Sequence, residues 1–452
     1  MSYFPCVLLI ACYRLVYYSK TNTASHFLHQ PAPIDLAGPR SEQKKMHGQK
    51  RDEYKARLKD SATAKKLALK AQQWNALSQT LLKRQHKTQE APKNVQADAH
   101  QILETLHLTE KLLAVNPDPV YLWNFRRELL LNPCLPTTDG SFLEQEQLLT
   151  QTALQRNPKA YGAWFHRKWS IRHHLQKSTD NDPDSKSVLQ AELGLCGELL
   201  MLDERNFHCW NYRRFIVGIM LEKLMTDGQS AMVMDGEWKL EGLLEDKCDV
   251  IGAQLTTKSV ADADAALANR AVALEVYQLL KLEWDFTTEK IEQNFSNGSA
   301  FHCRSKLLPL LLQLDTGSGD DVRTEYFQGE LELIRNAVFT EPDDQTSWWY
   351  LRFIISWANP RNKDDCKTED MELFQSTLYE EWMSIQELVE GEGGKCKWGL
   401  LGLHMIASEM CNLGEKGGRY EGENWEKLSK SYLVQLRDLD PDRRSRYDTM
   451  LE

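Results

Sequence analysis

The sequence predicts an all-α fold built from repeated αα-hairpins, and three observations support this prediction. A short word recurs along the chain: a small or acidic residue, a loop, an aromatic residue seven positions later, and then a basic pair. Successive aromatic anchors lie 41, 46, 91 and 47 residues apart, and all but the third spacing are the length of one helical hairpin. Apolar residues before each word recur at three- and four-residue steps, which is typical of an amphipathic helix.

The word occurs five times, and its aromatic anchors are Trp123, Trp164, Trp210, Phe301 and Trp348. A repeating aromatic residue is more often core than ligand site, so we interpret these anchors as wedges between helices. The basic pair follows three and four residues after each anchor, on a neighbouring helical face. We expect these arginines to hold loop carbonyls or to pair with acids of the next unit. The fifth copy has Leu351 at the first basic position and keeps only Arg352.

The first half of the chain divides into helical units joined by polar stretches. In the first unit, Asp118 is the expected N-cap and Pro119 the first helical residue. The expected segments are a basic helix pair at 50–86, a polar linker at 87–99, units one and two within 100–177, a polar loop at 179–186, and unit three at 187–224.

The second half contains the one irregular interval. Residues 226–281 are read as a surface insertion, or equally as a retained intron or mispredicted exon, with 261–282 able to form a helix. No strand alternation is recognised anywhere in the chain. The expected later segments are unit five at 325–357, helices at 374–389, 398–410 and 425–439, and a glycine-rich loop at 390–395.

Residues 1–45 differ in character from the rest. The apolar run at 5–18 is shorter than the roughly 20 residues that span a bilayer, and Arg14 interrupts it. It also lacks the basic start and small-residue cleavage site of a signal peptide. We expect a translated upstream extension or a disordered tail, with Met46 rather than Met1 as the start, and a membrane anchor as the alternative. The expected domains are 1–45, a basic helical segment at 46–99, and a repeat domain at 100–452.

Composition excludes several classes of function. The net charge of −10 and the pI of about 5.7 argue against nucleic acid as the main partner. The 10 cysteines form no Cys-x-x-Cys pattern and no spaced Cys/His set, so no metal site is predicted on this chain. This pattern indicates a reducing compartment, and no catalytic triad, phosphate loop or carboxylate pair is recognised.

The repeated words resemble those of the protein prenyltransferase α-subunit family. The stretches that carry the resemblance are residues 116–127, 157–169, 206–215, 294–305 and 344–353, together with Asp440–Arg443 near the end. Within that family they are most similar to the form that serves type II (Rab) geranylgeranyltransferase, and Met46-His47-Gly48 resembles its amino terminus. The resemblance implies a crescent-shaped solenoid of helical hairpins similar to tetratricopeptide repeats.

The resemblance also implies an activity and partners. This chain would be the α subunit of a heterodimer that transfers geranylgeranyl from geranylgeranyl diphosphate, the co-substrate, to carboxyl-terminal cysteines of Rab GTPases. Zinc would be bound by the β subunit only. The implied partners are that β subunit, a Rab escort protein and Rab GTPases, in the cytoplasm, without nucleic acid or stable membrane insertion.

Candidate site residues lie in the loops that enter two of the repeated helices. Lys159 and Tyr161 precede or begin a helix, whose amino terminus favours an anion through free N–H groups and the helix dipole. A lysine adds a point charge for a phosphate, and a tyrosine hydroxyl adds a donor. The resemblance assigns Lys159, Tyr161 and His208 to the diphosphate side of the isoprenoid. His47 is a weaker candidate that approaches zinc if Met46 is the start.

Two other functions remain open at this point. The same architecture also serves as the shared α subunit of farnesyltransferase and type I geranylgeranyltransferase. That enzyme would modify short Cys-a-a-X peptides without an escort protein. The third hypothesis is a non-catalytic helical-repeat scaffold, and it predicts that Lys159→Ala has no effect on any transfer rate.

Overall fold

The computed structural model describes most of the chain beyond its first 60 residues. It forms two compact units, Met1–Ala64 and Lys65–Glu452, and the account below concerns the second unit. The predictions for residues 1–45, for 46–60 and for His47 lie outside the described residues. The described ranges are 61–90, 95–133, 135, 141–176, 183–224, 230–234, 237–241, 260–315, 320–362, 367–413 and 424–452.

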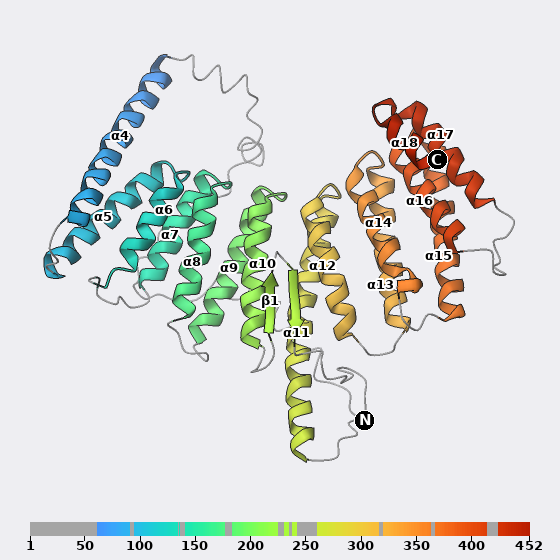
Figure 1. Cartoon of the computed structure of the whole chain (residues 1–452), viewed down its shortest axis with the longest axis horizontal. Coiled ribbons are helices and arrows are strands. Elements are labelled where there is room, and N and C mark those ends of the chain that lie inside the picture. Colours follow the sequence, from blue (N-terminus) through green and yellow to red (C-terminus); the bar gives the residue numbers. More distant parts are fainter. Residues whose placement is uncertain are drawn as a thin grey trace, which may run out of the picture. The chain divides into compact units, whose positions relative to one another are not determined.

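Consecutive helices pair as hairpins, and each hairpin contacts the next one along the chain (Figure 1). This confirms the all-α hairpin-repeat fold. Among the described residues, no helix combines the length and apolar character needed to cross a bilayer. The helices are α4 (Ser61–Glu90), α5 (Val95–Val115), α6 (Val120–Leu130), α7 (Ser141–Arg156), α8 (Tyr161–Leu175), α9 (Pro183–Leu202), α10 (Phe207–Leu224), α11 (Val260–Gln293), α12 (Gly298–Leu314), α13 (Asp320–Thr340), α14 (Gln345–Ala358), α15 (Thr368–Gly391), α16 (Lys397–Leu413), α17 (Trp425–Leu439) and α18 (Arg444–Leu451), with short 3-10 turns at Pro360–Asn362 and Pro441–Arg443.

The interval between the third and fourth repeats contains the only strands among the described residues. β1 (Ser230–Met234) pairs with β2 (Glu237–Glu241) as an antiparallel hairpin, with Ser230 opposite Glu241. The prediction of no strands was therefore wrong at this one place. The expected helix at 261–282 is confirmed as part of α11, which begins at Val260 and continues through the start of the fourth repeat.

Several expected boundaries differ from the structure. The described part of the basic segment is one continuous helix, α4, rather than a helix pair, and it extends into the expected linker as far as Glu90. The expected loop at 179–186 was wrong at its end, because Pro183 begins α9, a position that proline favours. In α6 the N-cap is Pro119, so the helix begins one residue later than expected. The last helix, α18, was not predicted.

The tryptophan in four of the five words is buried and fixes the loop that precedes its own helix. Its indole N–H donates to a loop carbonyl six residues earlier, at 2.8–3.0 Å. The carbonyl belongs to Pro117 for Trp123, Pro158 for Trp164, Glu204 for Trp210, and Pro342 for Trp348. All four side chains lie in one apolar core that continues through the repeats. The interpretation of these residues as wedges is confirmed, and they, rather than the arginines, hold the loop carbonyls.

The first basic residue of the first four words is a buried arginine that binds a glutamate on the first helix of the next hairpin. Each guanidinium donates two hydrogen bonds of 2.6–2.8 Å to one carboxylate, which is the strong bidentate form of an ion pair. The pairs are Arg126–Glu146, Arg167–Glu192, Arg213–Glu283 and Arg304–Glu330. The expectation that arginines pair with acids of the next unit is confirmed for these four.

Each of three glutamates also contacts the word of its own hairpin. His166 meets Glu146, while the Tyr212 and Tyr350 hydroxyls donate to Glu192 and Glu330, all at 2.6–2.7 Å. Burial opposes ionisation of Glu146, but the bonds from His166 and Arg126 lower the pKa of this carboxyl to about 2. One carboxylate therefore joins two successive hairpins. We call the series of buried arginine–glutamate pairs the ladder, and it fixes how each hairpin is aligned with the next.

The fifth repeat departs from this ladder. Leu351 is fully buried at the position where the other words have arginine, yet α15 still provides a buried glutamate, Glu381. Arg335 of α13 donates to Oε2 of Glu381 at 2.8 Å, whereas Oε1 of Glu381 has no hydrogen-bond partner among the described residues. Burial raises the pKa of Glu381, and Arg335 only partly offsets this effect.

We expect Glu381→Gln to change how the free energy of unfolding depends on pH. A buried acid with a raised pKa binds its proton more tightly in the folded state, so its contribution to stability falls as pH rises above the ordinary glutamate range. The variant lacks the titrating carboxyl, so its free energy of unfolding relative to the wild type should increase from about pH 4.5 towards neutral pH. Urea titrations at several pH values measure this. Glu380→Gln, at the exposed neighbouring position, is the control, and a difference that does not vary with pH would contradict the expectation.

Candidate functional site

The predicted site is built on the loop of the second repeat and on α8 and α10. The Asn157 side chain accepts from the backbone N–H of Lys159 at 3.0 Å, so the loop forms a local side-chain turn. Neighbouring loops are joined in the same region. Asn157 donates to Asp118 at 2.5 Å, and Asn206 donates to the carbonyl of Pro158 at 3.2 Å. The backbone that carries Lys159 is therefore held from both sides, while its side chain is exposed.

The two helix amino termini at this site differ. The N-cap of α8 is Ala160, which provides no side-chain bond to the first turn. At α10, Asn206 accepts from the N–H groups of His208 and Cys209 at 3.1 and 3.4 Å. Because uncapped N–H groups and the helix dipole favour an anion, the start of α8 is the better anion site of the two.

The three predicted residues come together. The rings of Tyr161 and His208 meet edge to face, with centroids 4.2 Å apart, although they lie in different repeats. Tyr161 is 66% exposed, whereas His208 is only 7% exposed. Lys159 is close enough for its charge to act on His208. Only Lys159 lies in a loop as expected, since Tyr161 begins α8 and His208 lies in the first turn of α10. The three side chains form one surface, with a tyrosine hydroxyl and an ammonium group open to solvent.

The environment of His208 favours the neutral imidazole. Burial lowers the pKa of His208, and the positive charges of Lys159 and Lys168 lower it further. A neutral imidazole still has one N–H to donate. An anion bound among these groups would offset the repulsion from the lysines and raise this pKa, so the site responds electrostatically to an anionic ligand.

Further cations extend this surface and were not among the predicted residues. Burial lowers the pKa of Lys168, and the nearby charges of Arg214 and Arg172 lower it further. Lys168 and Arg172 both lie over the ring of Phe215, at 5.2 and 4.9 Å from its centroid. We name this surface, formed by Lys159, Lys168, Arg172 and Arg214, the basic stripe.

The sequence held a signal for part of the stripe. Lys168 and Arg214 are the second residues of their basic pairs, one position after the arginines that form the buried ladder. Successive residues of a helix are rotated by about 100°, so the second basic residue points away from the buried glutamate and towards the surface. The sequence pattern alone does not separate the buried first residue of each basic pair from the surface-directed second residue. Arg172 belongs to no repeated pattern and could not have been identified.

This arrangement can bind a diphosphate-like anion. It offers an uncapped helix terminus, a tyrosine hydroxyl, a neutral imidazole and several cations whose mutual repulsion an anion would relieve. No group of three or more His, Cys, Asp or Glu side chains arranged for a metal ion occurs among the described residues.

Comparison with known proteins identifies the repeats. Residues 143–174, 189–220 and 327–358 match the protein prenyltransferase alpha subunit repeat. The chain is 28% identical over 355 residues to the geranylgeranyl transferase type-2 subunit alpha of Saccharomyces cerevisiae, covering 77% of this chain and 85% of that protein. It is 31% identical over 265 residues to the Homo sapiens protein of the same name, covering 58% of this chain.

The lengths of these relatives differ. The matched region spans only 35% of the human protein, so this chain corresponds to about a third of that relative. A solved chain of Candida albicans protein geranylgeranyltransferase-I complexed with GGPP aligns with 80% of this chain at 16% identity and a TM-score of 0.42. Similarity at that level carries no weight for function.

Proposed function

Because the chain belongs to the protein prenyltransferase α-subunit repeat family, we propose that it is the α subunit of a heterodimeric type II geranylgeranyltransferase. The enzyme transfers geranylgeranyl from geranylgeranyl diphosphate to carboxyl-terminal cysteines of Rab GTPases. This chain acts in the cytoplasm with a β subunit, and an escort protein presents the Rab. The names of the relatives from yeast and human support the type II assignment.

The observation that carries the site assignment is the convergence of Lys159, Tyr161 and His208. In the reaction, the cysteine sulfur forms a bond to C1 of the isoprenoid while the bond from C1 to the diphosphate oxygen breaks. The electron pair of that bond leaves with the diphosphate. Positive groups placed where this charge accumulates lower the barrier. The basic stripe, with the Tyr161 hydroxyl and the His208 N–H, provides such groups on this chain.

The remaining chemistry belongs to the partner. A zinc ion on the β subunit would lower the pKa of the substrate thiol, so that the thiolate is the nucleophile. Lys159, Tyr161 and His208 bind the diphosphate end, and the zinc ligands belong to the β subunit. We therefore assign the donors at the start of α8 and α10 to orientation of the substrate and stabilisation of the leaving group.

We expect Lys159→Ala to slow geranylgeranyl transfer by about tenfold or more. One lost hydrogen bond to a charged group costs roughly 1.5–3 kcal/mol, which corresponds to at least this factor. The complex with the β subunit should form as before, because the side chain is exposed and forms no bond within the described part of the chain. The measurement is the single-turnover rate of the co-expressed heterodimer on a Rab with its escort protein.

The control is Lys186→Ala, at an exposed position on α9. A chain that binds the type II β subunit and transfers at an unchanged rate after Lys159→Ala would refute the site assignment. A chain that ignores this β subunit but activates the farnesyltransferase β subunit on short Cys-a-a-X peptides would replace type II with the shared form. Failure with both partners would favour a scaffold.

A further inference from the structure

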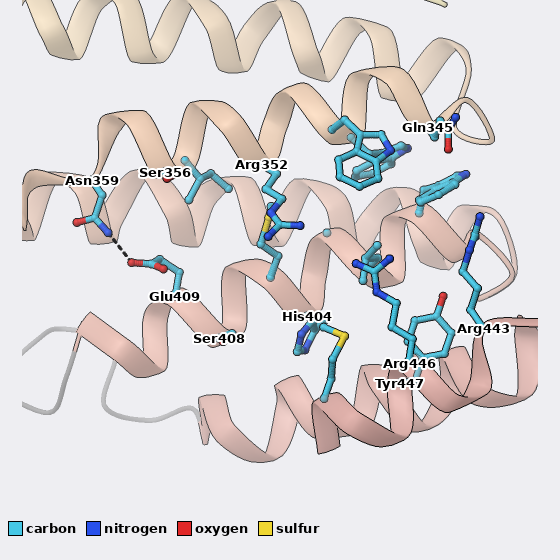
Figure 2. Close-up of a pocket in the computed structure, with 18 of the residues that line it drawn as sticks. Gln345, Arg352, Ser356, Asn359, His404, Ser408, Glu409, Arg443, Arg446 and Tyr447 are labelled. Atoms are coloured by element: carbon cyan, nitrogen blue, oxygen red, sulfur yellow. Dashed lines mark hydrogen bonds between the residues drawn. The ribbon is translucent and has the colours of Figure 1, made fainter. Parts of the chain in front are cut away.

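A cavity of about 620 Å³ lies far along the chain from the basic stripe, between α14, α16 and α18. Its walls are formed by residues of the fifth and later repeats (Figure 2). Nothing in the proposed transfer reaction uses these residues. We propose that this cavity is a docking groove for an acidic peptide segment of a partner protein, with carboxylates flanked by an aromatic or aliphatic side chain.

The charges of the groove select an anion. Arg352 of α14 and Arg446 of α18 point into it from opposite walls (Figure 2). Both side chains are exposed, and neither forms an ion pair with any residue in the described part of the chain. A chain with a net charge of −10 thus presents two unpaired guanidinium groups to one cavity. Guanidinium groups prefer carboxylate or phosphate oxygens, so the groove favours an anionic occupant.

The acidic residue in the wall does not cancel this preference. Glu409 lies at one end of the groove, where it accepts a hydrogen bond from the Asn359 side chain at 2.6 Å (Figure 2). Arg443 is already occupied, since it pairs with Asp440 at 3.0 Å and lies over the ring of Trp398. The free positive charge is therefore that of Arg352 and Arg446, in the middle of the groove.

Apolar side chains in the lining of the groove indicate more than a bare anion. Trp348, Trp398 and Tyr447 form buried parts of the lining, while Trp349 and Met450 are 51% and 40% exposed. Exposed large apolar groups beside charged ones are typical of protein-binding surfaces, where an aromatic ring anchors the partner. Carboxylates alone would leave this apolar surface in water.

The length of the groove indicates a peptide. The α16 residues that line it run from Trp398 to Glu409, about 16 Å at the helical rise of 1.5 Å per residue. About five residues of extended chain, at roughly 3.3 Å each, cover this distance. A single phosphate or carboxylate would fill only the centre. The occupant that matches charge, apolar lining and length together is an extended acidic segment with an apolar side chain.

The test measures binding of a fluorescein-labelled pentapeptide of alternating aspartate and phenylalanine to the full chain by anisotropy. We expect saturable binding that weakens with salt, and about tenfold or greater weakening when asparagine replaces each aspartate. Arg352→Gln and Arg446→Gln should each weaken binding by about tenfold. Lys427→Gln, at an exposed position on α17 outside the groove, should leave it unchanged.

Four outcomes would overturn the proposal. Absence of saturable binding below millimolar peptide would exclude an acidic segment, and equal binding of the asparagine peptide would make the groove merely apolar. Inorganic phosphate that competes as well as the peptide would identify a small-anion site. Self-association of the wild type that disappears in Arg352→Gln, measured by sedimentation, would make a second copy of this chain the occupant. Circular dichroism confirms that each variant is folded.

Discussion

Replacing Glu192 with alanine is expected to lower the free energy of unfolding by about 3–5 kcal/mol, the usual cost of leaving a buried charge without its partner. Glu192 accepts two bonds of 2.7 Å from Arg167, one of 2.7 Å from Tyr212 and one of 2.6 Å from Gln147. Its loss leaves the guanidinium of Arg167 and the hydroxyl of Tyr212 buried without the carboxylate that accepted their hydrogen bonds. The contacts come from α7, α8 and α10, so three helices lose a shared partner.

Two comparisons separate the ion pair from ordinary truncation. Glu198→Ala, at an exposed position on the same helix, should change stability little. The double variant Arg167→Met with Glu192→Leu should recover much of the loss, since apolar side chains can replace a buried pair. Urea titration followed by circular dichroism measures all of these. A cost below about 1 kcal/mol for Glu192→Ala would mean that the ladder contributes little to stability.

Gly162→Ala is expected to cost about 1–3 kcal/mol, the typical effect of overpacking a closed core. A Cβ at Gly162 would lie 2.4 Å from Cδ1 and 2.9 Å from Nε1 of Trp123. Trp123 is fully buried, and its indole is fixed by the bond to Pro117, so the ring has little room to move. The added methyl would force α8 away from α6, one residue from Tyr161 of the predicted site.

Gly194→Ala is the matched control, because a Cβ there meets nothing within 4 Å. Alanine is favoured over glycine in a helix interior by about 0.5–1 kcal/mol, so this variant of α9 should gain stability. The two substitutions are chemically identical and should have opposite signs. Equal effects on thermal unfolding would show that helix propensity, rather than contact with Trp123, determines the result.

The repeated word predicted the fold because its residues act locally and identically in each copy. The five aromatic anchors marked the hairpins, and of the two roles expected for the arginines, pairing with acids of the next unit is confirmed for four. The partner glutamates could not be identified from sequence, since nothing distinguishes Glu192 from Glu198 until the helix faces are known. The hairpin of β1 and β2 was missed because each strand has only five residues, although β2 alternates polar and apolar side chains from Glu237 to Glu241.

The candidate site was predicted only as far as one repeat could reveal it. Lys159 and Tyr161 stood out because they flank a helix start, and resemblance to the family added His208. Their convergence depends on how α8 packs against α10, which is a property of the pairing between repeats. Arg172 and Phe215 joined the surface through the same packing. The groove around Arg352 and Arg446 was not foreseen, because α18 had not been recognised as a helix.

The ladder of carboxylates also governs where the chain can change length. From Glu146, Glu192 and Glu330 to the His166, Tyr212 and Tyr350 side chains that contact them, the separation is always 20 residues. From each arginine to the glutamate of the next hairpin, the separations are 20, 25, 70 and 26. Differences in length among the repeats of this chain therefore fall in the connections between hairpins. The same connections are where a fluorescent label or a foreign domain can be inserted without shifting the register of any repeat.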